Sequence, residues 1–312
     1  MRRPTLRMRR PTLRMRRRTL LITGALVVLV VAAAGVGLAL TRDGDGGIDL
    51  PGRIAVIDGC GLKHMWPDGT DQRELCLPGI WESVSLSFNG KTLAWDTSKG
   101  SQSGISIAKS DATDERQLPV PRTVNVAPSL SPDGRRVAFL HSAADDGRYD
   151  VWSTDATSTS DVAEQVTAVR KVSFVAWSPK GDWLAYVKDW SEETLEGQIV
   201  LVRSNGDDEQ LLGAGDQPAW APDGKTLAFV HGGNLWTVAR DGSQRRLLTR
   251  NGEAPAWSRD GKQVAFMREE KCGEAECKER VFLVFADGNE PRPVGPRFPA
   301  GHRLLWLPDP NE

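Results

Sequence analysis

The sequence predicts an all-β fold, a six-bladed β-propeller, from a repeated hairpin pattern, from the repeat spacing and from a repeat split between the chain ends. Five copies of one unit each open with Leu or Trp and reach a turn Gly four positions later: residues 86–90, 130–134, 177–181, 220–224 and 257–261. With Trp306, which opens a partial sixth copy, the leading positions lie 44, 47, 43, 37 and 49 residues apart. Repeats of this length are typical of propeller blades, each a four-stranded sheet.

The first two strands of each unit are predicted to form a hairpin. In Ser-Pro-Asp-Gly, Pro fixes φ near the value the turn needs and Gly accepts a positive φ. The second strand pairs a small with a large residue, as in Ala138-Phe139 and Ala228-Phe229. This alternation suits a strand packed between neighbouring blades.

A third and a fourth strand complete each unit. The third strand runs into a second turn, which is Asn-Gly or Asp-Gly at residues 205–206, 241–242 and 287–288. These dipeptides are strong hairpin signals.

The sixth unit is split across the chain. Residues 53–76 supply three of its strands, and residues 302–306 supply the first. Pairing of the two segments would close the ring and remove unprotected sheet edges. The alternative is five blades with unpaired ends.

Charge separates a basic start from an acidic remainder. Residues 1–18 carry nine Arg and no acid, so 40 − 9 = 31 basic residues face 41 acidic ones in the rest of the chain, a net charge of about −10. This balance argues against nucleic acid as the partner.

Residues 19–40 contain no charged residue and are long enough to cross a bilayer as one helix. The expected organisation is therefore a cytoplasmic tail (1–18), a transmembrane helix (19–40), a flexible linker (41–51) and an extracytoplasmic propeller (52–312). A signal peptide, with secretion after cleavage, is the alternative. The repeated start leaves Met1, Met8 and Met15 as possible initiation sites.

The four cysteines are predicted to form disulfides. An even number of cysteines in an extracytoplasmic domain favours this chemistry. We expect a local Cys272–Cys277 bridge, which leaves Cys60 with Cys76, although the spacing alone permits other pairings. A zinc site is the weaker interpretation, because the spacings fit no common zinc pattern.

Two segments resemble the repeat of TolB-type propellers: Trp-Ala-Pro-Asp-Gly-Lys-Thr-Leu-Ala-Phe at 220–229 and Asp-Gly-Ser-Gln-Arg-Arg-Leu-Leu-Thr at 241–249. The resemblance covers about residues 52–312 and implies a TolB-like interaction module. The smaller α/β domain that precedes the propeller in TolB has no counterpart in this sequence.

Candidate partner-binding residues lie in the loops between second and third strands. These loops vary in length, carry acidic charge and include a Trp outside the repeat positions, features typical of a contact surface. The candidates are Asp145, Asp146, Asp189, Trp190, Glu192, Glu193 and Glu196. Solvated acidic loops without a partner are the alternative.

A second candidate set occupies the position four residues before the leading residue of a unit. It comprises Glu82, Asp216, Glu253 and His302, here called the channel mouth. Carboxylates with one imidazole can hold a divalent cation or act as acid and base. Nearby Arg residues favour structural ion pairs instead.

No catalytic motif, resident metal or cofactor is expected. The chain is predicted to be a monomeric, non-catalytic module that binds a protein or peptide partner in the cell envelope. The alternative is a metal-dependent hydrolase or lactonase that uses the channel mouth.

Overall fold

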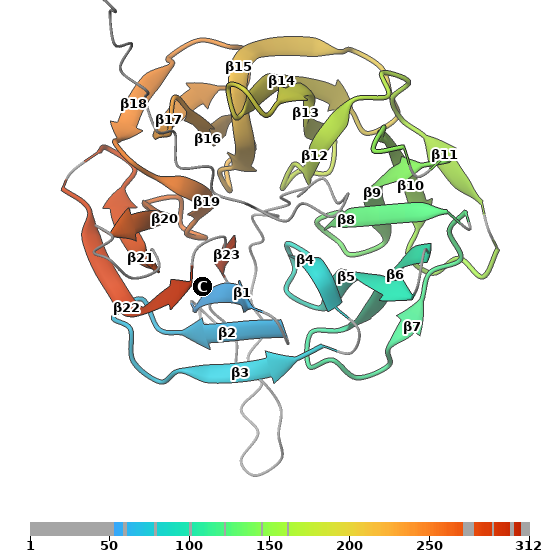
Figure 1. The fold of residues 1–312 in the computed structure, drawn as a ribbon, viewed down its shortest axis with the longest axis horizontal. Helices are drawn as coiled ribbons and strands as arrows, with labels where there is room; N and C mark the ends of the chain where they lie inside the picture. Colours follow the sequence, from blue (N-terminus) through green and yellow to red (C-terminus); the bar gives the residue numbers. More distant parts are fainter. Residues whose placement is uncertain are drawn as a thin grey trace, which may run out of the picture.

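The computed structural model describes residues 53–58, 61–77, 80–99, 102–121, 123–144, 146–160, 162–270, 278–288, 290–299 and 303–306. Regular structure within these residues consists of β-strands, and the sheets are arranged in a ring around one axis (Figure 1). The all-β propeller fold is therefore confirmed.

Four sheets have four antiparallel strands each. The first contains β23 (Arg303–Trp306), β1 (Ile54–Asp58), β2 (Gly61–Met65) and β3 (Arg73–Cys76). The second contains β4 (Ile80–Leu86), β5 (Thr92–Lys99), β6 (Gln102–Lys109) and β7 (Arg116–Gln117). The third contains β8 (Val124–Leu130), β9 (Arg136–Ser142), β10 (Asp150–Asp155) and β11 (Ala163–Gln165). The fourth contains β19 (Glu253–Trp257), β20 (Gln263–Glu270), β21 (Lys278–Phe285) and β22 (Arg292–Pro299).

The fifth sheet has seven strands. These are β12 (Val172–Trp177), β13 (Trp183–Ser191), β14 (Glu196–Arg203), β15 (Gln210–Trp220), β16 (Thr226–His231), β17 (Asn234–Ala239) and β18 (Arg246–Thr249). The first half of β15 pairs with β14, and its second half pairs with β16.

The expectation of six separate blades is wrong. The structure has four separate four-stranded blades, and the repeat units at residues 172–215 and 216–249 share one continuous sheet. The reason is local: no loop interrupts the chain between the outer edge of one unit and the inner edge of the next. Gly215, with a φ of 157°, lets the chain pass close to Phe229 and Ile199, and Gly213 accepts a φ of 112° where the register of β14 with β15 shifts.

The predicted pairing of the chain ends is confirmed. Ile54 pairs with Trp306 and Ile57 with Arg303 in antiparallel register. The segments lie side by side in the ring although almost the whole propeller separates them in sequence (Figure 1). The alternative with unpaired ends is therefore wrong.

The expected transmembrane helix is not supported. Within the described ranges, no helix has the length and apolar character needed to cross a membrane. Residues 19–40, the tail 1–18 and the linker 41–51 lie outside the described residues.

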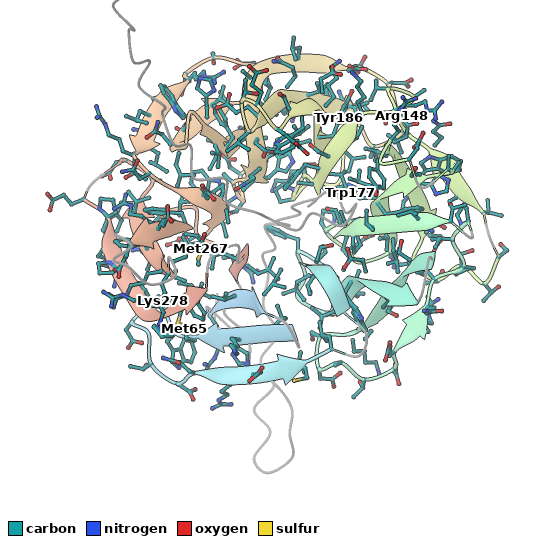
Figure 2. All side chains as sticks on the ribbon, in the orientation of Figure 1. Met65, Arg148, Trp177, Tyr186, Met267 and Lys278 are labelled. Atoms are coloured by element: carbon teal, nitrogen blue, oxygen red, sulfur yellow. The ribbon has the colours of Figure 1, made fainter. Side chains whose placement is uncertain are left out.

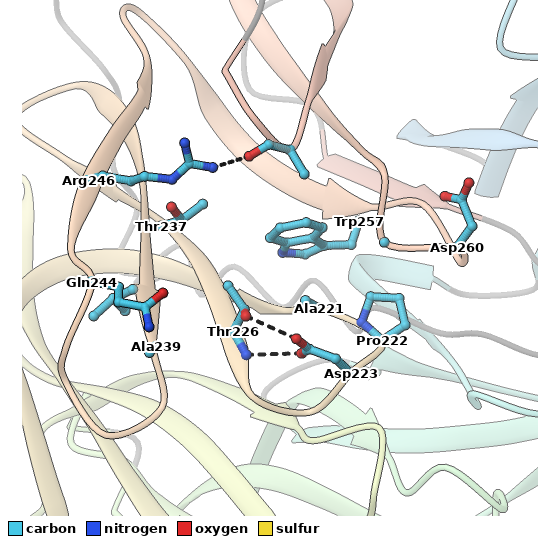
Figure 3. A pocket seen from close by; sticks show the side chains of 13 residues that line it. Ala221, Pro222, Asp223, Thr226, Thr237, Ala239, Gln244, Arg246, Trp257 and Asp260 are labelled. Carbon is cyan, nitrogen blue, oxygen red and sulfur yellow. Dashed lines mark hydrogen bonds between the residues drawn. The ribbon is translucent and has the colours of Figure 1, made fainter.

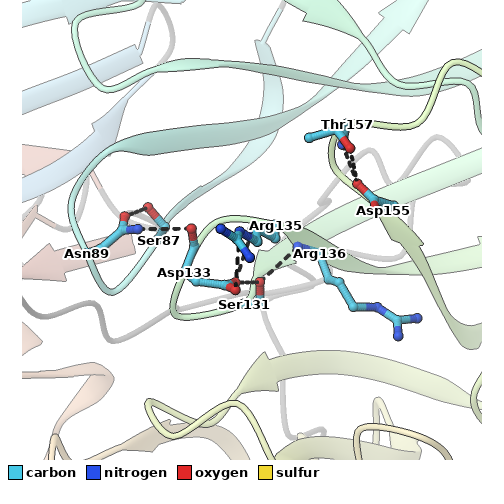
Figure 4. A network of polar contacts seen from close by, with 8 residues as sticks. All are labelled: Ser87, Asn89, Ser131, Asp133, Arg135, Arg136, Asp155 and Thr157. Carbon is cyan, nitrogen blue, oxygen red and sulfur yellow. Dashed lines mark hydrogen bonds and ion pairs between the residues drawn. The ribbon is translucent and has the colours of Figure 1, made fainter.

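The predicted hairpin turns are present and link neighbouring units. Gly134 adopts a φ of 73°, and its N–H donates to the Ser131 carbonyl at 2.9 Å. Oδ1 of Asp133 accepts from Ser131 Oγ at 2.7 Å and from the Arg135 N–H at 3.0 Å. The Asn89 amide reaches from the preceding turn to the Asp133 carbonyl at 2.9 Å (Figure 4). The turns of adjacent units are therefore joined by a hydrogen bond.

The apolar core lies between adjacent sheets. Trp177 and Tyr186, labelled in Figure 2, belong to a cluster that joins β8–β10 to β12–β14. The closing sheet packs in the same way, with Ile54 and Leu304 against residues of β19–β21. Burial of these faces makes each blade depend on its neighbours.

Candidate functional site

The antiparallel strand order gives the ring two faces. The turn face carries the Pro-Asp-Gly turns that join first and second strands. The loop face, opposite, carries the ends of the second strands and the beginnings of the inner strands. Trp190 at the end of β13 and Glu253 at the start of β19 both belong to the loop face.

Trp190 contacts the channel mouth directly. Its Nε1 donates to Oδ2 of Asp216 at 3.2 Å. The sequence placed these residues in two separate candidate sets, and the structure brings them together. An indole N–H on a partly buried carboxylate is a charge-assisted contact that fixes both side chains.

A β-bulge positions Asp216 and its neighbour. The register of β15 with β16 shifts between Asp216 and Ala219, and Gln217 adopts a φ of 52°. Asp216 Oδ1 accepts from the Gln217 N–H at 2.8 Å. Gln217 Oε1 in turn accepts from the N–H of Ala254 at 2.6 Å, in the inner strand of the next unit. Polar contacts thus link three successive units, from the loop residue Trp190 to the inner strand β19.

The inner strand β19 has a bulge at the corresponding place. Its register shifts between Glu253 and Ala256, and Ala254 has a φ of 50°. A bulge redirects the side chains beside it. The repeated bulge is therefore what orients the residues four positions before the leading Trp.

Glu253 has an electrostatically unfavourable environment. Burial of the carboxyl among surrounding protein atoms raises its pKa, and the negative charges of Glu279, Glu269 and Asp216 raise it further. The side chain keeps access to solvent at the start of β19. The two described channel-mouth residues therefore lie within electrostatic reach of each other and of further acids on β20 and β21.

The full channel-mouth set is only partly described. The backbone of Glu82 belongs to β4, but nothing is described of its side chain, and His302 lies outside the described residues. Among the residues whose side chains are described, no group of three or more His, Cys, Asp or Glu is arranged to hold a metal ion.

Sequence reasoning missed Asp96, which supports a bulge in another unit. Asp96 is 2% exposed, and its carboxylate accepts from the Ser83 N–H at 2.8 Å and from Ser83 Oγ at 2.6 Å. It also accepts from the N–H of Ala127, whose φ is 56°, at 3.3 Å. The available signal was an acid at a repeat position that is otherwise apolar: Leu140, Val187, Val230 and Met267.

Several loop candidates have partners within the molecule. Asp146 accepts from the Arg148 N–H at 3.1 Å and pairs with Arg170 at 3.5 Å. Asp189 pairs with Lys171 at 3.4 Å. These carboxylates stabilise their own loops, and surface pairs of this kind contribute little to stability.

Glu196 links two hairpins of the loop face. It accepts from Nδ1 of His231 at 3.0 Å and from the N–H of Gly232. The His231 ring lies edge-on to Trp236, with centroids 5.9 Å apart. Glu196 therefore has a positioning role in the structure.

The tip of the β13–β14 hairpin faces solvent. Glu192 and Glu193 are exposed, and the neighbouring Leu195 is 65% exposed. Asp145 lies outside the described residues. The tip thus presents two acids and one apolar side chain above the Trp190–Asp216 contact.

Cys76 is disulfide-bonded. The other three cysteines, Cys60, Cys272 and Cys277, lie outside the described residues, so the expected pairings remain predictions.

Comparison with known proteins agrees with this geometry. The family described as TolB beta propeller domain matches residues 66–295. A curated relative, the uncharacterized protein YidR of Escherichia coli K12, is 27% identical over 113 residues. That match covers 36% of this chain and 26% of YidR, so the chain matches about a quarter of the length of this relative.

Solved structures share the fold at low identity. TolB from Acinetobacter baumannii superposes with a TM-score of 0.64 at 18% identity, covering 82% of this chain and 67% of TolB. A nidogen/laminin complex gives a TM-score of 0.57 at 12% identity, with coverage of 81% and 97%. An oligogalacturonate lyase in complex with manganese gives 0.53 at 12%, with coverage of 78% and 77%. At these identities the likeness concerns the fold alone.

Proposed function

Because the chain belongs to the TolB β-propeller domain family, we propose that it is a non-catalytic module that binds a protein or peptide partner. The binding surface is the loop face around the β13–β14 hairpin. The single observation that carries the proposal is the contact of Trp190 with Asp216, 3.2 Å long, which anchors the exposed hairpin to the inner strands.

The hairpin has the properties of a contact surface. Glu192 and Glu193 supply negative charge, and exposed Leu195 supplies apolar area between them and the next strand. Trp190 fixes the base of the hairpin, which reduces the entropy lost when a partner binds. A partner segment with basic and apolar side chains complements this surface.

Site-specific photo-crosslinking tests the proposal. A crosslinking residue is placed at position 192, 193 or 195 of the full chain in its own cells. The matched control is position 205, which is exposed in a turn of the opposite face. We expect one common crosslinked product from the three hairpin positions, none from position 205, and a several-fold loss with Trp190→Ala.

Two results would count against this function. The first is the absence of a hairpin-specific product. The second is a product whose yield is the same with and without Trp190→Ala.

We also propose an extracytoplasmic location. The disulfide bond at Cys76 supports it, because such bonds persist in oxidising compartments. Protease digestion of the propeller in intact cells checks the location, and protection until the cells are lysed would contradict it.

The metal-dependent hydrolase remains the second candidate function. Only Asp216 and Glu253 of its four residues have described side chains, and Glu253 is the one with the raised pKa. Calorimetric titration of the purified chain with Mn²⁺, Zn²⁺ and Ca²⁺ separates the two functions. Stoichiometric binding that Asp216→Asn abolishes would favour the hydrolase.

A further inference from the structure

A cavity of about 400 Å³ opens between two neighbouring repeat units (Figure 3). One wall comes from the unit of β16–β18, and the other comes from the unit of β19–β22. The Pro-Asp-Gly turn at 221–224 and the equivalent Arg-Asp-Gly turn at 258–261 border it, so it belongs to the turn face. It is therefore separate from the loop face and from the function proposed for that face.

Three small residues create the cavity. They are Thr226, Ala239 and Ala286, and all three line it. Thr226 pairs with Ala239 across β16 and β17. Ala286 follows β21 of the next unit, where its N–H donates to the Lys262 carbonyl at 2.8 Å.

One interface earlier in the ring, the same three positions hold large side chains. Trp183 lies six residues after its leading Trp, as Thr226 does, and pairs with Arg203 as Thr226 pairs with Ala239. Arg240 corresponds to Ala286, since its N–H donates to the Lys225 carbonyl at 2.7 Å. The repeat therefore aligns Trp183, Arg203 and Arg240 with the three small residues of the cavity.

These large side chains form a stacked group that fills the earlier interface. The guanidinium carbons of Arg203 and Arg240 lie 4.3 and 5.4 Å from the centroid of the Trp183 ring. Guanidinium groups over an indole ring make favourable cation–π contacts. The molecule thus shows what this space accommodates: a flat aromatic ring with adjoining positive charge.

The charge of the open cavity suits the same kind of group. Two carboxylates belong to its lining: Asp223, which accepts from Thr226 Oγ1 at 3.0 Å, and Asp260, which pairs with Lys262 at 3.2 Å (Figure 3). At the earlier interface the positions aligned with these two hold Lys180 and Asp223. The acid that pairs with Arg203 and Arg240 there is Asp182, at 3.6 and 3.9 Å, and its aligned residue at the open cavity is Lys225. Trp257 adds an aromatic wall between the two turns.

Arg246 forms the outer wall of the cavity, and its positive charge lies at the rim. Its guanidinium donates to the carbonyls of Ala286 and Asp287, which holds it at the rim. Arg116 occupies the corresponding place in the unit of β4–β7 and donates to the Ala156 and Ser158 carbonyls. An Arg at this position therefore links neighbouring units by hydrogen bonds in at least two places of the ring.

The cavity also has a polar floor. Thr237 is 4% exposed and lines it. At the same register in another unit, Ser153 accepts from a guanidinium nitrogen of Arg136 at 2.7 Å. A hydroxyl at this register is thus already used in the molecule as an acceptor for a cationic side chain.

We propose that this cavity binds an aromatic side chain of a peptide partner with a neighbouring Arg or Lys. The ring enters the space that Trp183 fills at the earlier interface. The cation faces the Asp223 and Asp260 carboxylates, away from Arg246.

The test uses the full chain and a capped tetrapeptide, glycine-tryptophan-arginine-glycine, in calorimetric titrations. Two further peptides replace the tryptophan by alanine or the arginine by glutamine. We expect one site per chain for the first peptide, at least tenfold weaker binding for each of the others, and weaker binding at high salt.

Filling the cavity with larger side chains of this chain should weaken binding of the peptide. Thr226→Trp introduces an indole ring where the earlier interface has Trp183. Ala239→Arg, a separate variant, introduces a guanidinium where the earlier interface has Arg203. Each should weaken binding at least tenfold while the thermal midpoint stays near the wild-type value. The matched control is Thr92→Trp, which makes the aligned change in another unit and should leave binding intact.

The inference is overturned if the tryptophan-arginine peptide does not bind at millimolar concentration. It is equally overturned if folded Thr226→Trp and Ala239→Arg variants bind as the wild type does. Equal binding of the alanine-containing peptide would show a purely electrostatic contact and would also contradict it.

Discussion

The indole nitrogen of Trp190 lies 3.2 Å from the Asp216 carboxylate, so a residue of an exposed hairpin is held by an inner strand of the ring. The contact explains why a Trp outside the repeat positions occurs in an acidic loop. It also predicts that the N–H, separately from the ring, contributes to stability.

Replacing Trp190 by Phe keeps the ring and removes the donor. We expect the free energy of unfolding to fall by about 1 kcal/mol, the typical contribution of one hydrogen bond. Urea unfolding measures the change. Trp190→Ala is the companion variant and should cost more, because it also removes apolar contact; equal losses would mean that the N–H contributes nothing.

Asp96 gives a stronger prediction. Asp96→Leu installs the residue found at the aligned position 140 but leaves the Ser83 N–H, the Ser83 hydroxyl and the Ala127 N–H without their acceptor. Buried unpaired donors are costly, so we expect a loss of about 3 kcal/mol or more. Asp96→Asn, which retains one acceptor oxygen, should lose less. A Leu variant as stable as the wild type would contradict this account of the bulge.

The continuous strand β15 depends on close approach at Gly215. A Cβ there would lie 2.7 Å from Cδ2 of Phe229 and 2.8 Å from Cδ1 of Ile199. Gly215→Val should therefore destabilise the fold by about 2–3 kcal/mol, as overpacking of a core does. Gly104→Ala is the control, since its nearest contact would be an ordinary 3.5 Å, and its thermal midpoint should change little.

Glu253 makes stability depend on pH. Burial and nearby acids raise the pKa of its folded-state carboxyl above the ordinary 4.5, so the ionised form is disfavoured by folding. The penalty is absent below the ordinary pKa and is complete once the pH exceeds the raised one. Glu253→Gln should therefore stabilise the protein at pH 7, with a gain that fades as the pH falls through 4.5.

Unfolding midpoints from pH 3.5 to 8 check this expectation. Glu192→Gln removes one negative charge from the same face without touching the inner strands, and it serves as the control. A constant difference between Glu253→Gln and the wild type over that range would refute the electrostatic explanation.

The pairing of β1 with β23, here called the seam, should be sensitive to the loss of buried side-chain volume. Leu305 in β23 is 1% exposed, so Leu305→Ala should cost about 2–4 kcal/mol. Val162→Ala, at a side chain that is 65% exposed, should change the unfolding free energy by less than about 0.5 kcal/mol. Comparable losses in the two variants would contradict the role of the seam.

Much of the fold was predictable because each repeat contains its own hairpin signals. Gly134 and its counterparts mark the turns, and the split repeat predicted the pairing that joins Ile54 to Trp306. The continuous sheet was not predictable in this way. Whether residues 210–220 bend or stay extended depends on the packing of Gly215 against Phe229 and Ile199, which no local pattern reports.

The sequence placed Trp190 and Asp216 in two unconnected candidate sets and did not predict the contact between them. A hydrogen bond between residues 190 and 216 depends on the orientation that the bulge gives to Asp216, and bulges leave little trace in sequence. The turn-face cavity was missed for another reason. It arises from absent volume at Thr226, Ala239 and Ala286, which three successive segments bring together.

The pairing of Ile54 with Trp306 also bears on how the protein assembles. Every other sheet is built from consecutive strands, so each can form as soon as its own segment has been synthesised. The sheet of β1–β3 must wait for β23, which is synthesised after every other strand of the described propeller. Until then its inner edge is open, and during this interval a nascent chain is most exposed to strand exchange with a second copy.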